Sequence, residues 1–201
     1  MKKQILLAML CIFAMHTSFS QDNSEIKPLK NIFKFSVTNF FDHTFQASYE
    51  RQTCDNAALM FSGGLLYQHN SSDEMSGFKF EAQYKYFVFT KEKETSGMKI
   101  YFAPYLFYRY TDKTDGYYMY DPGYGYTSTK YIFNSFSGGV YFGMGFTIAR
   151  KISIDGYIGG GIKRTFGGGL KDNVNYYSSG ITDPGYNGIT PKGGIDVGFK
   201  F

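Results

Sequence analysis

One stretch of the sequence alternates apolar and polar residues without a break from Phe78 to Val88. Successive side chains of a β-strand point to opposite faces, so this stretch forms a strand with one apolar and one polar face. The apolar face carries Phe78, Phe80, Ala82, Tyr84, Tyr86 and Val88, and the other face carries Lys79, Glu81, Gln83 and Lys85. A strand this long is uncommon in soluble proteins. The pattern is typical of a strand that crosses a membrane, with lipid on one side and a polar interior on the other.

The alternation recurs along the chain and predicts eight strands. They are expected at about 31–38, 44–51, 57–68, 78–88, 99–110, 139–149, 152–163 and 193–201. The connections differ in kind: those at 52–56, 91–97 and 149–151 are short, whereas those at 111–130 and 167–188 are long. Outer-membrane barrels have short turns on the periplasmic side and long loops outside. The sequence therefore predicts an all-β fold, an eight-stranded antiparallel up-and-down transmembrane β-barrel over residues 31–201, with a soluble β-sandwich as the alternative fold.

The N-terminal residues are expected to lie outside this fold. Lys2 and Lys3 precede an apolar run and then Ser18-Phe19-Ser20. A basic start, a short apolar core and a small-x-small site predict a cleaved secretory signal peptide over residues 1–20. Residues 21–30 are polar, and we expect a periplasmic lead-in. The remaining chain has no apolar run long enough for a transmembrane helix.

Composition argues against several classes of function. The formal net charge is only +4, too little positive charge to indicate nucleic-acid binding. Cys54 is the one cysteine outside the signal peptide, so no intramolecular disulfide and no metal site are expected. The glycine-rich runs lack the residues of a phosphate loop. We therefore expect no cofactor, no metal, no catalytic residues and no nucleic-acid partner.

Charged residues are confined to the face predicted to point into the barrel. None of the positions assigned to the lipid-facing side carries a charge. We expect an interior charge network made of Glu50, Glu81, Lys85, Lys99, Arg109, Asp155, Lys163 and Asp196. Eight strands enclose a space that side chains can fill, whereas water channels need wider barrels. An ionic plug is therefore favoured over a conducting pore.

The last stretch, Gly193 to Phe201, is expected to close the barrel. Ile195, Val197, Phe199 and Phe201 share its apolar face, while Asp196 and Lys200 lie opposite. This stretch resembles the C-terminal signal by which outer-membrane barrels are recognised for assembly, so these four residues are the predicted assembly signal. Barrel-assembly machinery and outer-membrane lipid are the partners that follow.

Two levels of resemblance support this interpretation. The organisation resembles the small eight-stranded barrels typified by outer membrane protein X and the membrane domain of OmpA. Three segments also resemble a family of Bacteroidetes outer-membrane proteins of undefined function: FEAQYKYFVFTKEKETSGMKIYFAPYLFYRY at 80–110, GGVYFGMGFTIARKISIDGYIGGG at 138–161 and GITPKGGIDVGFKF at 188–201. The resemblance implies a fold and a location, the outer membrane of a Gram-negative bacterium. It implies no chemistry.

Two classes of function stay open. The first is a non-enzymatic, structural or surface-interaction barrel, expected to be a monomer. Its candidate contact for a surface protein or glycan is a loop rich in Tyr and Gly, with Tyr118, Tyr120, Tyr124 and Tyr126; packing of these rings into an aromatic girdle is the alternative. The second class is a lipid A-modifying enzyme, because His69-Asn70-Ser71 has the His-x-Ser spacing of one deacylase family. That triplet lies in a polar loop, where nothing holds a base against a nucleophile.

Overall fold

The computed structural model of the chain describes residues 29–69, 73–93, 95–118, 126–169 and 180–201. The predicted signal peptide lies outside this part of the chain, and so does the predicted lead-in except for Leu29 and Lys30.

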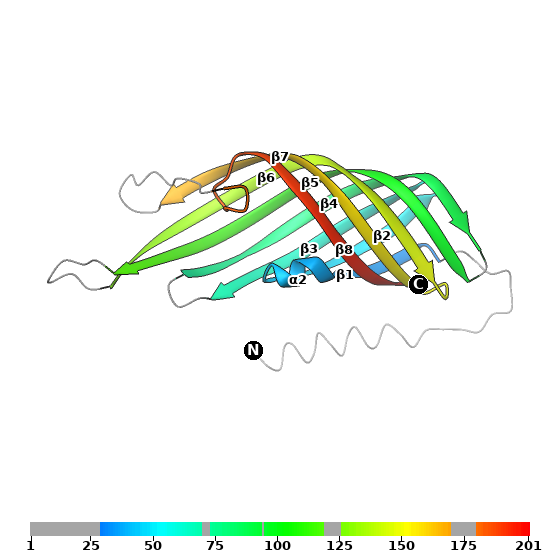
Figure 1. Cartoon of the computed structure of the whole chain (residues 1–201), viewed down its shortest axis with the longest axis horizontal. Coiled ribbons are helices and arrows are strands. Elements are labelled where there is room, and N and C mark those ends of the chain that lie inside the picture. Colours follow the sequence, from blue (N-terminus) through cyan, green and yellow to red (C-terminus); the bar gives the residue numbers. More distant parts are fainter. Residues whose placement is uncertain (1–28, 70–72, 94, 119–125, 170–179) are drawn as a thin grey trace.

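Eight strands form a closed ring. They are β1 (Asn31–Ser36), β2 (Thr44–Cys54), β3 (Ala57–His69), β4 (Asp73–Glu92), β5 (Ser96–Tyr118), β6 (Tyr126–Ile148), β7 (Ile152–Gly169) and β8 (Gly188–Lys200). Each strand pairs antiparallel with the next, and β1 pairs antiparallel with β8 (Figure 1). The prediction of an all-β, eight-stranded up-and-down barrel is confirmed. No helix in the described ranges is long and apolar enough to cross a membrane.

The first strand is shorter than expected. It ends at Ser36, and the chain continues as α2 (Val37–Phe41), a helix of five residues. The side chain of Asn39 turns into the barrel, where its Nδ2 donates to Ser36 Oγ at 2.7 Å and to Gln46 Oε1 at 3.0 Å. Phe40 and Phe41 point outward and are largely exposed. A strand cannot turn Asn39 inward and expose the two Phe side chains that follow it, because its residues alternate strictly between faces.

Several strands run further than predicted at the end of the barrel that carries the long connections, here called the loop end. Tyr118 and Tyr126 are the last paired residues of a β5–β6 hairpin, so most of the predicted loop 111–130 is strand. β7 likewise continues to Gly169, inside the predicted loop 167–188, and β4 begins at Asp73. Tyr and Thr favour strands where a partner strand is available, which explains the extension of the hairpin.

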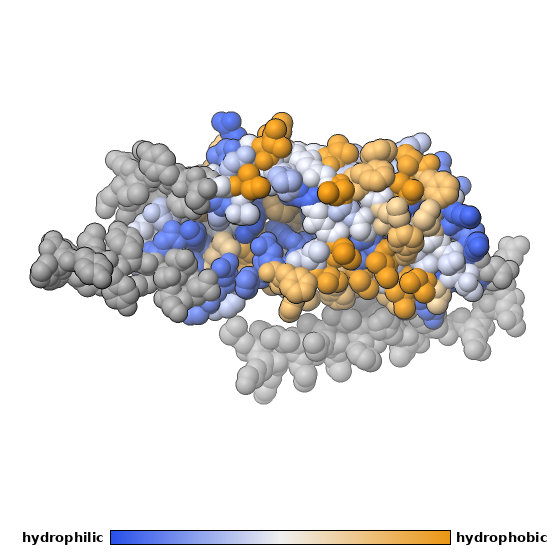
Figure 2. Space-filling view, viewed as in Figure 1, coloured by the Kyte–Doolittle hydropathy of each residue, from blue (hydrophilic) through white to orange (hydrophobic). Residues whose placement is uncertain are grey.

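The outward face of the barrel is an apolar belt. Every strand contributes exposed apolar side chains to it: Phe35, Phe45, Phe61, Phe80, Leu106, Phe142, Ile158 and Ile195 are examples. On β4 the belt runs from Phe78 to Val88, which corresponds to about 25 Å along the barrel axis at the usual rise and tilt. Figure 2 shows apolar side chains over the barrel wall on one face, with hydrophilic side chains toward the ends. The exposed Arg51 and Arg164 follow the belt on β2 and β7.

Two irregularities lie on β4 and β5. Pairing between these strands is interrupted between Gln83–Tyr105 and Tyr86–Phe102, opposite Pro104, without a change of register. Pro104 has no N–H to donate to the neighbouring strand, which explains the interruption. The register shifts instead between Phe87 and Phe89. Phe87 is therefore buried inside the barrel, whereas Val88 and Phe89 both face outward.

Candidate functional site: the barrel interior

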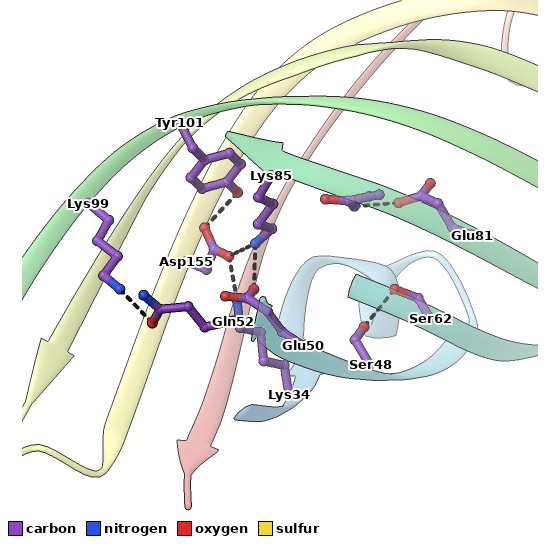
Figure 3. A network of polar contacts seen from close by, with 11 residues as sticks. Lys34, Ser48, Glu50, Gln52, Ser62, Glu81, Lys85, Lys99, Tyr101 and Asp155 are labelled. Atoms are coloured by element: carbon purple, nitrogen blue, oxygen red, sulfur yellow. Dashed lines mark hydrogen bonds and ion pairs between the residues drawn. The ribbon is translucent and has the colours of Figure 1, made fainter. Parts of the chain in front are cut away.

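Four charged side chains meet inside the half of the barrel that holds Asn31 and Phe201, here called the terminal end. Lys34, Glu50, Lys85 and Asp155, here called the charge quartet, come from β1, β2, β4 and β7 (Figure 3). Lys34 Nζ lies 2.6 Å from Glu50 Oε2 and 2.5 Å from Asp155 Oδ2. Lys85 Nζ lies 2.9 Å from Glu50 Oε2 and also contacts Asp155 Oδ2. The quartet is neutral, and each member is at least 95% buried.

Tyr101 completes the coordination of Asp155. Its hydroxyl donates to Asp155 Oδ1 at 2.7 Å, and its ring lies under Lys85 Nζ at 4.4 Å from the ring centre (Figure 3). Gly143 on the neighbouring strand makes room for this ring, because a Cβ at that position would overlap the phenol. Asp155 therefore receives hydrogen bonds from three side chains that reach it across the barrel.

A layer of polar and aromatic side chains lies at mid-height. Gln83 Nε2 donates to Glu81 Oε1 at 2.6 Å, and Tyr141 OH donates to Glu81 Oε2 at 3.0 Å. The rings of Tyr105 and Tyr141 stack with centroids 4.2 Å apart. We call Glu81, Gln83, Tyr105 and Tyr141 the middle layer. Its hydrogen bonds and stacked rings fill the barrel between the quartet and the loop end.

Cavities lie at both ends of the interior. The one at the terminal end, beside the quartet, has a volume of only about 30 Å³. The one at the loop end, here called the basic cavity, has a volume of about 500 Å³, with Glu81 and Tyr141 of the middle layer among its lining residues. The two share no lining residue in the described part of the chain. Side chains of the middle layer line the loop-end cavity on the side that faces the quartet.

Four cations line the basic cavity: Lys79 on β4, Arg109 on β5, Lys163 on β7 and Lys192 on β8. They approach from four strands because each occupies an inward position near the loop end. The segment 180–187 folds over the mouth of the cavity, and Lys163 Nζ donates to the carbonyl oxygens of Asp183 and Pro184, both at 3.1 Å. On another side of the cavity, Lys79 Nζ donates to Oδ1 of Asn39 in α2 at 2.9 Å.

The eight residues predicted as one interior network lie at different heights. Glu50, Lys85 and Asp155 belong to the quartet, Glu81 to the middle layer, and Arg109 and Lys163 to the basic cavity. Lys99 binds Gln52 Oε1 and Glu92 Oε1, both at 3.1 Å. Asp196 is fully buried, and neither of its carboxyl oxygens has a hydrogen-bond partner in the described ranges.

Sequence reasoning missed one contributor to these clusters, Lys192. Alternation had assigned Lys34 and Lys79 to the inward face, where both are buried, although the predicted network did not include them. Lys192 precedes the predicted start of the closing strand, whereas β8 begins at Gly188. Its alternation with Gly194 and Asp196 was the signal that could have identified it.

The predicted assembly residues Ile195, Val197, Phe199 and Phe201 all have exposed side chains on the outer face. β8 forms the seam of the barrel through its pairing with β1, which includes Phe33↔Phe199 and Phe35↔Val197. The backbone of Phe201 also exchanges hydrogen bonds with that of Asn31, at 2.8 and 3.1 Å.

The residues proposed for partner contact are only partly described. The sequence predicted that Tyr118 and Tyr126 lie in a loop. They instead form a backbone pair at the end of the β5–β6 hairpin. Tyr120 and Tyr124 lie outside the described residues. The same holds for Ser71 of the His-x-Ser triplet, whose His69 is the exposed last residue of β3. In the described part of the chain, no three His, Cys, Asp or Glu side chains gather as metal ligands would.

Comparison with known proteins adds little to this geometry. No family model and no curated protein matches the sequence. Among solved structures, the chain is similar to the N-terminal β-barrel domain of Pseudomonas aeruginosa OprF, with 13% identity and a TM-score of 0.36. The match covers 86% of this chain and 98% of that domain. A similarity this low carries no argument, so the eight-stranded barrel architecture rests on the strand pairing, and membership of a Bacteroidetes family stays a prediction.

Proposed function

We propose that this protein is a non-enzymatic integral β-barrel of the bacterial outer membrane, with a structural or surface-interaction role exercised at its loop end. The observation that carries the proposal is the apolar belt around a closed barrel whose interior holds the buried charged side chains. Lipid requires that backbone polar groups be satisfied within the spanning structure, and a closed barrel meets this requirement. The belt on β4 also matches the height of about 25 Å that outer-membrane barrels present to lipid.

The interior supports a plug in place of a pore. Side chains can fill a barrel of eight strands, and here the quartet and the middle layer occupy the space between the two cavities. A barrel with a filled interior would act through the segments that it holds at the membrane surface. The β5–β6 hairpin is the longest such element, with strands of 23 residues each.

Outer-membrane lipid and the barrel-assembly machinery are the partners that this role requires. The outward apolar side chains of β8 would present the recognition surface for assembly, because this strand must join β1 before the ring is complete. No second copy is needed to close the ring, so the proposed state is a monomer.

The proposal is tested by expressing the chain in a Gram-negative host. We expect the protein in the outer-membrane fraction, extractable only with detergent, with faster gel migration before boiling than after it. Trypsin should cleave the loop end in intact cells and spare the belt. Planar bilayers containing the purified protein should show no conductance steps. Recovery of the unboiled protein in the soluble fraction would refute the membrane role, and steady ion conductance would refute the plug.

The enzymatic alternative has a separate test. Lipid A from cells that express the protein should have the same mass as lipid A from cells with an empty vector. Loss of an acyl chain in the first sample alone would establish a deacylase and overturn the non-enzymatic proposal.

Contact through the hairpin tip is tested by replacing Tyr118, Tyr120, Tyr124 and Tyr126 with Ser. If the tip binds a surface protein or glycan, cells that display this variant should lose adhesion while the barrel keeps its heat-modifiable migration. Loss of folding would instead assign these residues to packing.

A further inference from the structure

The basic cavity holds more positive charge than its own surroundings neutralise. Arg109 lies near enough to Lys79, Lys163 and Lys192 for charge repulsion to act between it and each of them. Lys192 is also close enough to be repelled by Lys79 and Lys163. The acidic groups that face them are Glu81, Asp42 and Asp183. Four cations thus meet three carboxylates, and the cations occupy the walls of a space that is large enough for a ligand.

The contacts of these cations are mostly with neutral groups. Lys79 donates to Asn39 Oδ1, and Lys163 donates to two backbone carbonyls. Arg109 donates through Nε to Thr111 Oγ1 at 3.1 Å, and its Nη2 lies 4.0 Å from Met75 Sδ. Among the described residues, no carboxylate lies within 4.0 Å of these three cations. The charge quartet shows the opposite arrangement, with two carboxylates shared by two lysines at 2.9 Å or less.

Lys192 is held in an unusual way. Its Nζ lies 3.4 Å from the ring centre of Phe107 and 4.6 Å from that of Tyr105. Glu81 Oε2 is 3.6 Å away and already accepts a hydrogen bond from Tyr141. The ammonium group is buried and makes no hydrogen bond in the described part of the chain, and the same holds for the hydroxyl of the nearby Thr190. Buried polar groups are normally satisfied, and both residues line the basic cavity, so an acceptor bound there would satisfy them.

We propose that the basic cavity binds a small, multiply charged oxyanion of the phosphate type. Such a ligand presents several strong acceptors to ammonium and guanidinium donors, which form short charge-assisted hydrogen bonds with it. The volume of about 500 Å³ accommodates a phosphate or diphosphate group with water. The segment 180–187 over the mouth and the middle layer at the floor limit the size of the ligand.

The proposal goes beyond the proposed membrane role and is tested without a membrane. Folded protein in neutral detergent would be titrated with sodium pyrophosphate by calorimetry, and with inorganic phosphate in parallel. Sodium chloride of equal ionic strength provides the baseline. We expect saturable binding of one pyrophosphate per barrel, with weaker binding of phosphate. Removing one charged donor should weaken pyrophosphate binding about tenfold or more, so Arg109→Gln and Lys192→Gln are the test variants.

Lys200→Gln is the matched control. It makes the same chemical change at an inward lysine, but Lys200 lines the small cavity at the terminal end. It should bind pyrophosphate like the parent. Heat-modifiable migration establishes that each variant is folded, and a cavity variant that fails this criterion is replaced by Lys79→Gln.

Three results would overturn the proposal: no saturable binding by the folded parent, equal losses in Lys200→Gln and the cavity variants, or undiminished binding by folded cavity variants. The last two would assign the binding to the general surface charge. None of these results bears on whether the barrel resides in the outer membrane, which the fractionation experiment decides separately.

Discussion

Asp155 and Asp196 face each other across the pairing of β7 with β8, and the same substitution is expected to have opposite effects at the two positions. Both are almost completely buried. Asp155 accepts from Lys34, Lys85 and Tyr101, whereas the carboxyl oxygens of Asp196 have no hydrogen-bond partner among the described residues. The pair thus compares a partnered with an unpartnered buried carboxylate in one local environment.

Asp155→Asn removes a negative charge from a neutral cluster. In the described part of the chain, the two buried lysines then contact a single carboxylate, that of Glu50, so the groups in contact carry one positive charge in excess. Breaking a buried ion pair by removing one partner costs about 3 to 5 kcal/mol, because the remaining charge stays desolvated. Asp196→Asn removes a charge whose oxygens accept no hydrogen bond in the described ranges and that lies beside another carboxylate, with Lys34 and Lys85 acting on it only at longer range. The free energy of unfolding should then stay within about 1 kcal/mol of the parent or rise.

A third variant separates charge from shape. Asp155→Asn combined with Lys34→Met leaves Lys85 with Glu50, a neutral pair at 2.9 Å. Part of the stability lost in Asp155→Asn should return, although the methionine adds no hydrogen bond to Glu50. Recovery would show that the excess charge, and not the altered packing at position 155, carries most of the loss.

The assay is reversible urea unfolding of the barrel in lipid vesicles. The chain contains no Trp, so unfolding would be followed by far-ultraviolet circular dichroism and by the fraction of heat-modifiable protein on gels. Equal losses in Asp155→Asn and Asp196→Asn would refute the reasoning, because the quartet would then contribute no more than any buried carboxylate. A loss in Asp196→Asn alone would mean that Asp196 has a partner of its own.

Three further predictions follow from the wall and the seam of the barrel. Gly143→Ala should displace the ring of Tyr101 from Asp155 and lower the urea midpoint, whereas Tyr101→Phe combined with Gly143→Ala should lose little more than Gly143→Ala alone. Ala82→Arg places a charge in the middle of the belt on β4 and should cost about 2 to 4 kcal/mol of folding free energy in vesicles, whereas Ala82→Leu at the same position should fold like the parent. Deleting residues 199–201 removes the pairing of Phe199 with both β1 and β7, so membrane levels of heat-modifiable protein should fall sharply; unchanged levels would mean that the seam closes without it.

The direction of the side chains was the part most accessible from sequence. Strict alternation settles which residues share a face, and every strand here has an outward face with exposed apolar side chains and a face toward the barrel interior. Met60 and Leu66 blurred the pattern in 57–68, and both are buried inside the barrel. Departures from alternation were harder: Phe87 and Phe89 lie on opposite faces because a bulge at Val88 adds one residue to β4.

Contacts across the interior were not accessible in the same way. The quartet joins residues 121 positions apart, as in Lys34 and Asp155. Which residues meet depends on the stagger of strands around the ring, because strand tilt and register together set the height of each side chain. Alternation assigns Lys34 and Lys85 to the interior but does not place them at the same height. The short helix α2 was missed for a related reason, since the inward turn of Asn39 depends on partners that only the closed barrel supplies.

The interior separates two roles along the barrel axis. At the terminal end, two carboxylates and two lysines satisfy each other, so that region needs nothing from outside the chain. At the loop end, the lysine side chains contact carbonyls, an amide and aromatic rings, and Arg109 donates to a hydroxyl. A neutral, saturated cluster resists change, because any single substitution within it leaves a buried charge. The basic cavity can lose or exchange a charge with less damage to the fold, and substitutions there should alter binding before they alter stability.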